Sequence, residues 1–194
     1  MSSTRLLVLG AVRIFQPAHG YLVRRELASW QVDDWANLNP GSVYNALRTL
    51  TRDGLLEEAE APIAVGGTGP AARITYRLTA DGESEFLRLV RDAVWQLHPY
   101  EPAWLLAGLS FWLVLTRDEA LAALTARRAQ LQARLSGLGY EADDVRHLPA
   151  IPDHVVEHYL LHEHQLRGEL GWVDEVTHRL SEGAYTFAGE GPQG

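Results

Sequence analysis

Between residues 39 and 57, apolar and polar positions separate onto two sides of a helix. Val43, Ala46, Leu47 and Leu50 recur at i, i+3, i+4 and i+7, which makes one apolar stripe. The opposite side carries hydroxyl, amide and guanidinium groups, from Ser42, Asn45, Arg48, Thr49 and Arg52. Such groups hydrogen-bond base edges and phosphate oxygens in a major groove. The pattern therefore predicts a helix with one packing face and one DNA-reading face.

Both ends of this helix carry local signals. Asn39 is a favourable N-cap and Pro40 a favourable first helical residue. The free backbone N–H groups of the first turn are able to meet a phosphate. Asp53-Gly54 ends the pattern. We expect a recognition helix whose Asn45 and Arg48 contact bases. Its other polar residues would hold the DNA backbone.

Two strands are predicted directly after this helix. Residues 55–60 read as one strand and residues 73–79 as its return. The loop between them contains Gly66, Gly67, Gly69 and Pro70. A recognition helix followed by a hairpin with a glycine-rich tip is a winged helix-turn-helix. Arg73, at the wing, is predicted to contact the backbone or the minor groove.

Four short motifs in the first ninety residues together resemble one family. They are His19-Gly20-Tyr21, Pro40-Gly41-Ser42-Val43-Tyr44, Asp53-Gly54-Leu55 and the segment 76–82, Tyr-Arg-Leu-Thr-Ala-Asp-Gly. Their order and spacing resemble the PadR family of bacterial transcriptional regulators. The resemblance implies a homodimer and a phosphate contact by Tyr44, for which packing on the second helix is the alternative. Asn45 stands where that family commonly has proline.

Helical periodicity also organises the rest of the chain. Further helices are predicted over residues 5–15, 20–31, 79–97, 116 to 137 or 139, and 153–181, with a buried apolar run at 103–115. Pro99 and Pro102 mark a domain junction. The expected fold is mainly α: a winged helix-turn-helix domain (1–98) with a two-stranded wing, then an all-α dimerisation and effector domain (99–182). A disordered Gly-rich tail (183–194) would follow.

The last predicted helix carries an imperfect heptad. Its apolar members are Val156, Tyr159, Leu166, Leu170, Val173 and Leu180. Helix-turn-helix regulators read two half-sites through a two-fold axis, so a dimer seam is the favoured interpretation. Packing within one subunit is the alternative.

Aromatic residues concentrate around the domain junction. Candidates for the walls of a flat apolar pocket are Trp95, Tyr100, Trp104, Phe111 and Trp112. The resemblance to the PadR family implies that such a pocket takes an aromatic effector. Ordinary core packing is the more frequent role for such residues.

Histidines gather on the last predicted helix. His154, His158 and His162 recur at i, i+4 and i+8, where two are able to hold one Zn²⁺. Structural or exposed histidines are the favoured interpretation, and neither a metal nor another cofactor is expected.

The net charge of −8 lies entirely in the second half of the chain. Residues 1–91 hold ten Arg and ten acidic residues, whereas residues 92–194 hold seven Arg and fifteen acidic residues. A neutral first half predicts few phosphate contacts. The chain has no cysteine, no signal peptide and no apolar run long enough to span a membrane, so a cytoplasmic location is expected.

No catalytic motif is found, and an enzyme is not expected. The sequence and the resemblance together favour a homodimeric transcriptional regulator that binds an inverted-repeat operator. We expect a repressor that leaves the operator when a small effector binds. The alternative is a small-molecule or metal-binding protein whose winged helix makes protein contacts.

Overall fold

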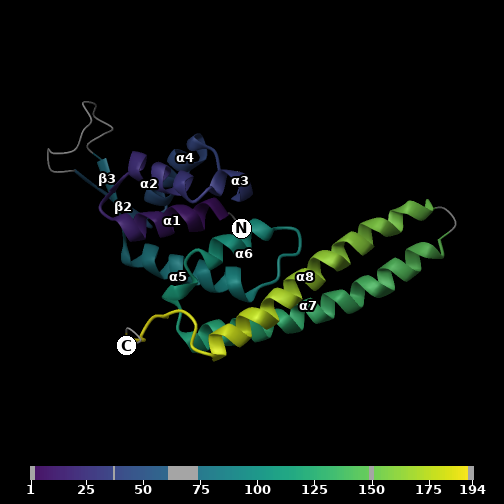
Figure 1. Cartoon of the computed structure of the whole chain (residues 1–194). Helices are drawn as coiled ribbons and strands as arrows, with labels where there is room; N and C mark the ends of the chain where they lie inside the picture. The colour runs from purple at the N-terminus through teal and green to yellow at the C-terminus, as the bar shows by residue number, and fades with distance from the viewer. Residues whose placement is uncertain (1–2, 37, 61–73, 149–150, 192–194) are drawn as a thin grey trace. The chain divides into compact units, whose positions relative to one another are not determined.

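The protein, described by a computed structural model over residues 3–36, 38–60, 74–148 and 151–191, forms two compact units. The first comprises Met1–Ala93 with Glu101–Trp112, and the second comprises Val94–Tyr100 with Leu113–Gly194. Helices dominate both units, and a small sheet lies in the first (Figure 1). The mainly α, winged-helix fold predicted from the sequence is confirmed.

The first unit follows the order of a winged helix-turn-helix. Its helices are α1 (Ser3–Phe15), α2 (Gly20–Ser29), α3 (Val32–Ala36), α4 (Pro40–Arg52), α5 (Ala80–Trp95, which continues into the second unit) and α6 (Pro102–Leu109). Strands β2 (Leu56–Glu60) and β3 (Ile74–Leu78) pair antiparallel, with Leu56 opposite Leu78. A strand that the sequence did not predict, β1 (Ala18–His19), pairs with the other side of β3.

Helix α1 forms the centre of the first unit. Its residues 6–12 are all buried, on every side of the helix, because α2, α4, α6 and β3 pack around it. Gly10 lets α6 approach closely: a Cβ atom there would lie 2.2 Å from Cζ of Phe111. The Phe111 ring in turn makes edge contacts with Trp30 and Phe86.

This packing corrects the predicted domain boundary. The sequence assigned residues 99–182 to the C-terminal domain, but α6 and Phe111 belong to the first compact unit. Proline does break the chain after α5, as expected, yet the chain returns to the first unit before leaving it again. Sequence periodicity does not reveal which core an apolar segment joins.

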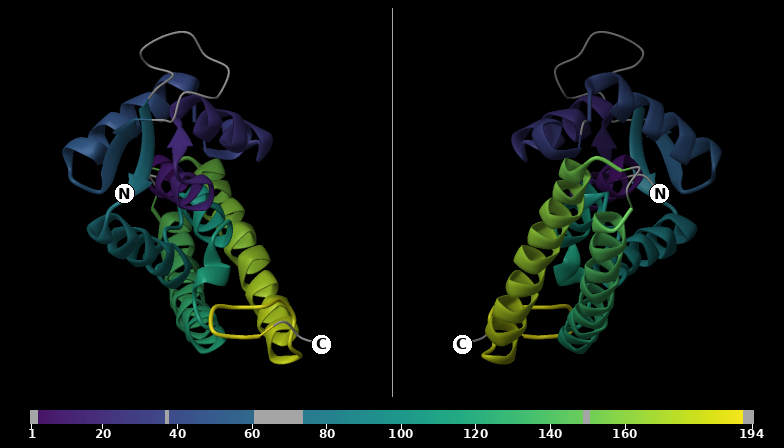
Figure 2. Two further views of the ribbon diagram at one scale, coloured as in Figure 1. Left: turned by 90° about the vertical axis from the view of Figure 1, so that its left-hand side faces the viewer. Right: turned by 90° about the vertical axis from the view of Figure 1, so that its right-hand side faces the viewer.

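The second unit is built on a helical hairpin. Helix α7 (Arg117–Arg146) and helix α8 (Val156–Ser181) run side by side along their length (Figures 1 and 2). Short 3₁₀ turns lie at Trp112–Val114 and Asp153–Val155. A capping box of Thr116 and Glu119 starts α7. The helix passes through Gly137 and Gly139 rather than ending there, because tertiary packing of Leu138 and Ala142 outweighs the low helix propensity of glycine.

The predicted disordered tail is wrong for residues 183–191. Phe187 is buried, and Ala188 N–H bonds to the carbonyls of Leu113 and Leu115. Arg117 holds Glu190 at 2.6 Å and also donates to the carbonyls of Leu180, Ala184 and Tyr185. One aromatic anchor and one arginine therefore order a segment whose composition alone is typical of disorder.

Candidate nucleic-acid interface

Helix α4 has the predicted boundaries and the predicted packing face. The Asn39 side chain accepts a hydrogen bond of 2.9 Å from Ser42 N–H. Val43, Leu47 and Leu50 are buried, and Gly54, with φ of 74°, ends the helix in the left-handed region that favours glycine. The first turn therefore begins with its cap in place, and its remaining N–H groups point away from the helix.

Asn39 gives a direct test of this start. Replacement of Asn39 by Ala is expected to lower the free energy of unfolding by about 1 kcal/mol, because the cap bond to Ser42 is lost. Urea denaturation followed by circular dichroism measures the change. Replacement by Asp, which keeps an acceptor, serves as the control. Equal losses in both variants would contradict the capping role.

The outward face of α4 is available to a ligand. Asn45, Arg48 and Arg52 are exposed, while Ser42 and Thr49 are half-buried. A guanidinium nitrogen of Arg48 donates to the amide oxygen of Asn45, so the two predicted base-contacting side chains lie together. Their paired donors and acceptors match those on the edges of base pairs.

Tyr44 packs against α2 and is also partly exposed, so its predicted phosphate contact remains a prediction. It is 42% exposed, but its ring also lies against α2, since a Cβ atom on Gly20 would be 3.0 Å from Cε1 of Tyr44. A side chain at position 20 would require the ring to shift by a few tenths of an ångström. The ring therefore packs α4 against α2 while part of the residue remains exposed.

The wing contributes one described arginine. Arg77, on β3, is exposed and stands opposite Glu57 in the β2–β3 register. Glu57 and Glu58 on β2 are also exposed, so this part of the wing carries both signs of charge. Arg73 lies outside the described residues, and its predicted contact remains a prediction.

Two residues of α2 that the sequence did not single out for DNA contact, Tyr21 and Arg24, lie against each other. Tyr21 is 62% exposed, and the guanidinium of Arg24 lies over its ring at 5.9 Å from the centroid. The first helix of a helix-turn-helix crosses the DNA backbone, where such a stacked guanidinium suits a phosphate. The signal in the sequence is an aromatic and an arginine at i and i+3, where the aromatic is the tyrosine of the His-Gly-Tyr motif.

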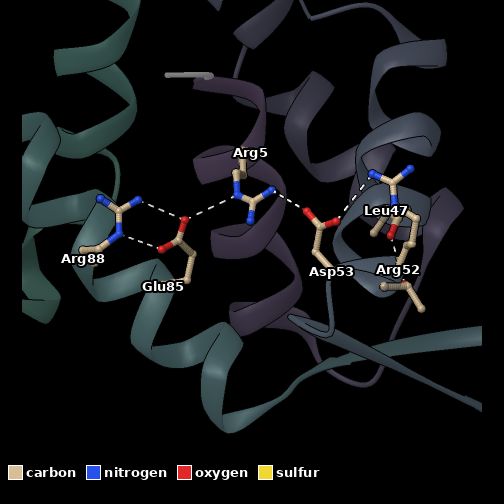
Figure 3. Close-up of polar contacts among 7 residues, drawn as sticks. Arg5, Leu47, Arg52, Asp53, Glu85 and Arg88 are labelled. Atoms are coloured by element: carbon tan, nitrogen blue, oxygen red, sulfur yellow. Dashed lines mark hydrogen bonds and ion pairs between the residues drawn. The ribbon is translucent and has the colours of Figure 1, made fainter.

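A row of ion pairs fixes the end of α4 (Figure 3). Arg5 Nη1, on α1, is 3.0 Å from Asp53 Oδ2, and Asp53 Oδ1 is 3.5 Å from Arg52 Nη2. The hydrogen bond from Arg5 lowers the pKa of Asp53 below its usual value. Asp53 is therefore ionised at neutral pH.

The predicted effector residues are divided between the two units and differ in burial. Trp104 and Phe111 are buried core residues, and the Trp104 indole N–H donates to Asp92. Trp112 belongs with them to the first unit, whereas Trp95 and Tyr100 belong to the second. An open apolar groove of about 460 Å³ lies elsewhere in the first unit, lined by Ile14, Trp30, Trp35, Leu106 and Ser110.

The predicted dimer seam is partly used within the chain. Leu166, Val173 and Leu180 are buried in the hairpin of α7 and α8, which corrects their assignment to an intersubunit surface. Val156, Tyr159 and Leu170 are half-buried. The large apolar residues that the second unit exposes along the hairpin are Tyr140, Leu148 and Leu161.

The three spaced histidines differ in burial. His162 is buried, whereas His154 and His158 are exposed. Over the described ranges, no group of three His, Asp or Glu side chains is arranged to hold a metal ion. The His162 ring lies 4.8 Å from the ring of Tyr100, with Nδ1 at 3.5 Å from the hydroxyl. Burial lowers the pKa of His162; Arg134 and His158 lower it further, and Glu141 opposes them.

This environment makes the stability of the protein depend on pH. In the unfolded chain His162 takes up a proton near pH ~6.5, whereas in the folded chain its lowered pKa shifts protonation to a lower pH. Stability is therefore expected to fall as pH decreases from about 6.5 towards the lower folded pKa. In His162→Leu, melting temperatures at pH 7.5 and 5.5, set as about one pH unit on either side of that value, should differ less than in the wild type. His154→Gln, which alters an exposed histidine, should retain the wild-type difference between the two melting temperatures. If His162→Leu showed the same difference as the wild type, His162 would not be the source of the pH dependence.

Comparisons with known proteins agree with the order of elements in the first unit. Residues 8–88 match the model of the family described as "Transcriptional regulator PadR-like family". No curated protein sequence matches the chain. Among described helices, none has the length and apolar character that a bilayer crossing requires.

Solved structures with weak similarity cover almost the whole chain. Bacillus subtilis PadR in complex with operator DNA is 20% identical, over 91% of this chain and 98% of that chain, with a TM-score of 0.38. The same protein in complex with p-coumaric acid is 17% identical, over 92% and 99%, with a TM-score of 0.37. The protein smu.1604c from Streptococcus mutans UA159 is 16% identical, over 94% and 98%, with a TM-score of 0.39. Scores below 0.5 define no common arrangement of the whole chain, whereas the family match is specific to the winged helix. The similarity to the PadR-like family of transcriptional regulators thus covers residues 8–88 of this chain, from α1 into α5.

Proposed function

We propose that this protein is a sequence-specific DNA-binding regulator that represses transcription from an inverted-repeat operator. The observation that carries the proposal is the outward face of α4, where Asn45 and Arg48 are exposed together beside a two-stranded wing. Asn45 and Arg48 would contact bases. Ser42, Tyr44, Thr49, Arg52 and Arg73 would hold the backbone, with Tyr21 and Arg24 as additions from α2.

DNA fragments from the promoter of the protein's own gene provide the test. A gel shift with this promoter, competed by unrelated duplex, should show a complex that survives a large excess of competitor. If unlabelled promoter duplex and unrelated duplex competed equally well, sequence-specific binding would be refuted. The alternative function, a ligand-binding protein whose winged helix contacts proteins, predicts no complex with either duplex.

A homodimer is part of the proposal, because a palindromic site requires two DNA-binding domains, one for each half-site. The half-buried Val156, Tyr159 and Leu170 are candidates for the contact, together with the exposed apolar residues of the hairpin. Sedimentation equilibrium measures the mass in solution. A monomer at the concentrations that shift DNA would contradict this element.

Release by a small effector is the remaining element of the proposal. The groove lined by Trp30 and Trp35 is a better candidate for the site than the buried Trp104 and Phe111. Two indoles and one hydroxyl, with no charged lining residue, suit a planar aromatic compound. Titration with p-coumaric acid should quench tryptophan fluorescence in the wild type and not in Trp30→Leu. Equal quenching in both would exclude this groove.

A further inference from the structure

Five charged side chains of alternating sign form one row across three helices of the first unit (Figure 3). Arg88 and Glu85 of α5 are 2.7 Å apart, and Glu85 is 3.5 Å from Arg5 of α1. Arg5 also forms an ion pair with Asp53, and Asp53 forms one with Arg52, the last residue of α4. The row therefore ends on a side chain of the proposed DNA-contacting face.

Two arginines share the carboxylate of Asp53 unequally. Arg5 is 3.0 Å from it, and both side chains are 32% exposed. Arg52 is 3.5 Å away, and its side chain is 76% exposed. The closer and more shielded partner is the stronger one, because solvent weakens an exposed ion pair. Asp53 is thus neutralised mainly by a residue that is not on the proposed DNA-contacting face.

Removal of Arg5 would affect the two ends of the row differently. Glu85 would keep Arg88, which makes two hydrogen bonds to it of 2.7 and 3.0 Å. Asp53 would keep only Arg52 among the arginines of this row. The uncompensated carboxylate would then hold Arg52 and repel an approaching phosphate.

We propose that Arg5 is a positioning residue for DNA binding: it neutralises Asp53 and so leaves Arg52 able to exchange its weak contact with Asp53 for a phosphate oxygen. This inference rests on the proposed function, since it takes α4 to be the DNA-contacting helix. It assigns control of affinity, but not of sequence preference, to a side chain on the central helix. A phosphate contact carries no base information, so every duplex should respond equally.

Fluorescence anisotropy with a labelled duplex of arbitrary sequence tests the proposal on the full chain. Arg5→Gln should weaken binding about fivefold at low salt, the upper range for one exposed charge pair. It should also reduce the slope of log affinity against log salt by about 0.9, as expected for one lost phosphate contact. Arg13→Gln is the matched control, because Arg13 lies on the same helix and pairs with Glu83 at 2.9 Å. It removes the same charge and should have a much smaller effect.

Rescue separates positioning from structural support. Arg5→Lys should restore most of the affinity, since it keeps a positive charge near Asp53. Adding Asp53→Asn to Arg5→Gln should also restore affinity, because no carboxylate then competes for Arg52. Asp53→Asn alone should bind at least as tightly as the wild type. This single variant also tests the inference if Arg5→Gln melts below the assay temperature.

Three results would overturn the inference while leaving the proposed function intact. They are equal affinities of Arg5→Gln and Arg13→Gln, a double variant as weak as folded Arg5→Gln, or weaker binding by Asp53→Asn than by the wild type. A wild-type protein that binds no duplex at low salt would instead refute the proposed function itself.

Discussion

Replacement of Arg127 by methionine is expected to lower the free energy of unfolding by about 3 kcal/mol. Arg127 is 2% exposed and lies 2.6 Å from Glu169 on α8. It also donates to the carbonyls of Val94 and Gln96, at 3.3 and 2.8 Å. One guanidinium thus joins α7, α8 and the 94–100 segment inside the second unit. Methionine fills similar space but leaves a carboxylate and two carbonyls without this donor.

Guanidinium denaturation at one fixed protein concentration measures this loss, because oligomerisation would otherwise change the apparent stability. Adding Glu169→Met to Arg127→Met should recover part of the lost stability, since no carboxylate then remains unpaired. Arg128→Met is the control: Arg128 is adjacent, 53% exposed and paired with Asp174 at the surface. A loss in Arg128→Met as large as that in Arg127→Met would show that burial of the ion pair is not the cause.

Replacement of Arg48 by alanine is expected to cost about 1–3 kcal/mol of binding free energy at one operator base pair, if the contact is bidentate. Arg48 is exposed on α4 and already oriented by Asn45, so little ordering is needed on binding. Binding to a set of single-base operator variants measures the effect. Discrimination should disappear at one position and persist at the others.

Two matched variants show whether the effect of Arg48→Ala is specific to one base position. Arg52→Ala should weaken binding to all operator variants equally and lower the salt slope by about 0.9, as expected for a phosphate contact. Arg128→Ala removes the same charge in the second unit and should leave the base profile unchanged. An Arg48→Ala profile identical to that of the wild type would remove Arg48 from the base-reading set.

The candidate interface was more predictable than its surroundings. Helix α4 carries its own cap, its own stop and a complete apolar stripe within sixteen residues, Asn39 to Gly54. Each signal acts over a few residues, so periodicity and capping rules are sufficient to find it. Tyr21 and Arg24 were not predicted as DNA contacts. Their contact lies within one turn of α2, and nothing in the periodicity of that helix distinguishes these two residues from other surface residues.

The dimer and effector predictions show the opposite case. A stripe such as Leu166, Val173 and Leu180 predicts that some surface covers it, but its period is the same for a neighbouring helix and for a second subunit. Aromatic clustering at the junction likewise predicts burial or a pocket without distinguishing them. The structure buries both Trp104 and Phe111, and Gly10 on α1 makes room for the Phe111 ring.

The sequence by itself determined the helices with strong caps, the β2–β3 wing, the polar face of α4 and the family of residues 8–88, since each depends on residues close together in the chain. Tertiary structure alone decided the assignment of α6 to the first unit, the order of the tail around Phe187, the course of α7 through its glycines and the row of ion pairs from Arg88 to Arg52. These features join residues tens of positions apart. The free energy that orders them comes from contacts with a partner segment, which local periodicity does not identify.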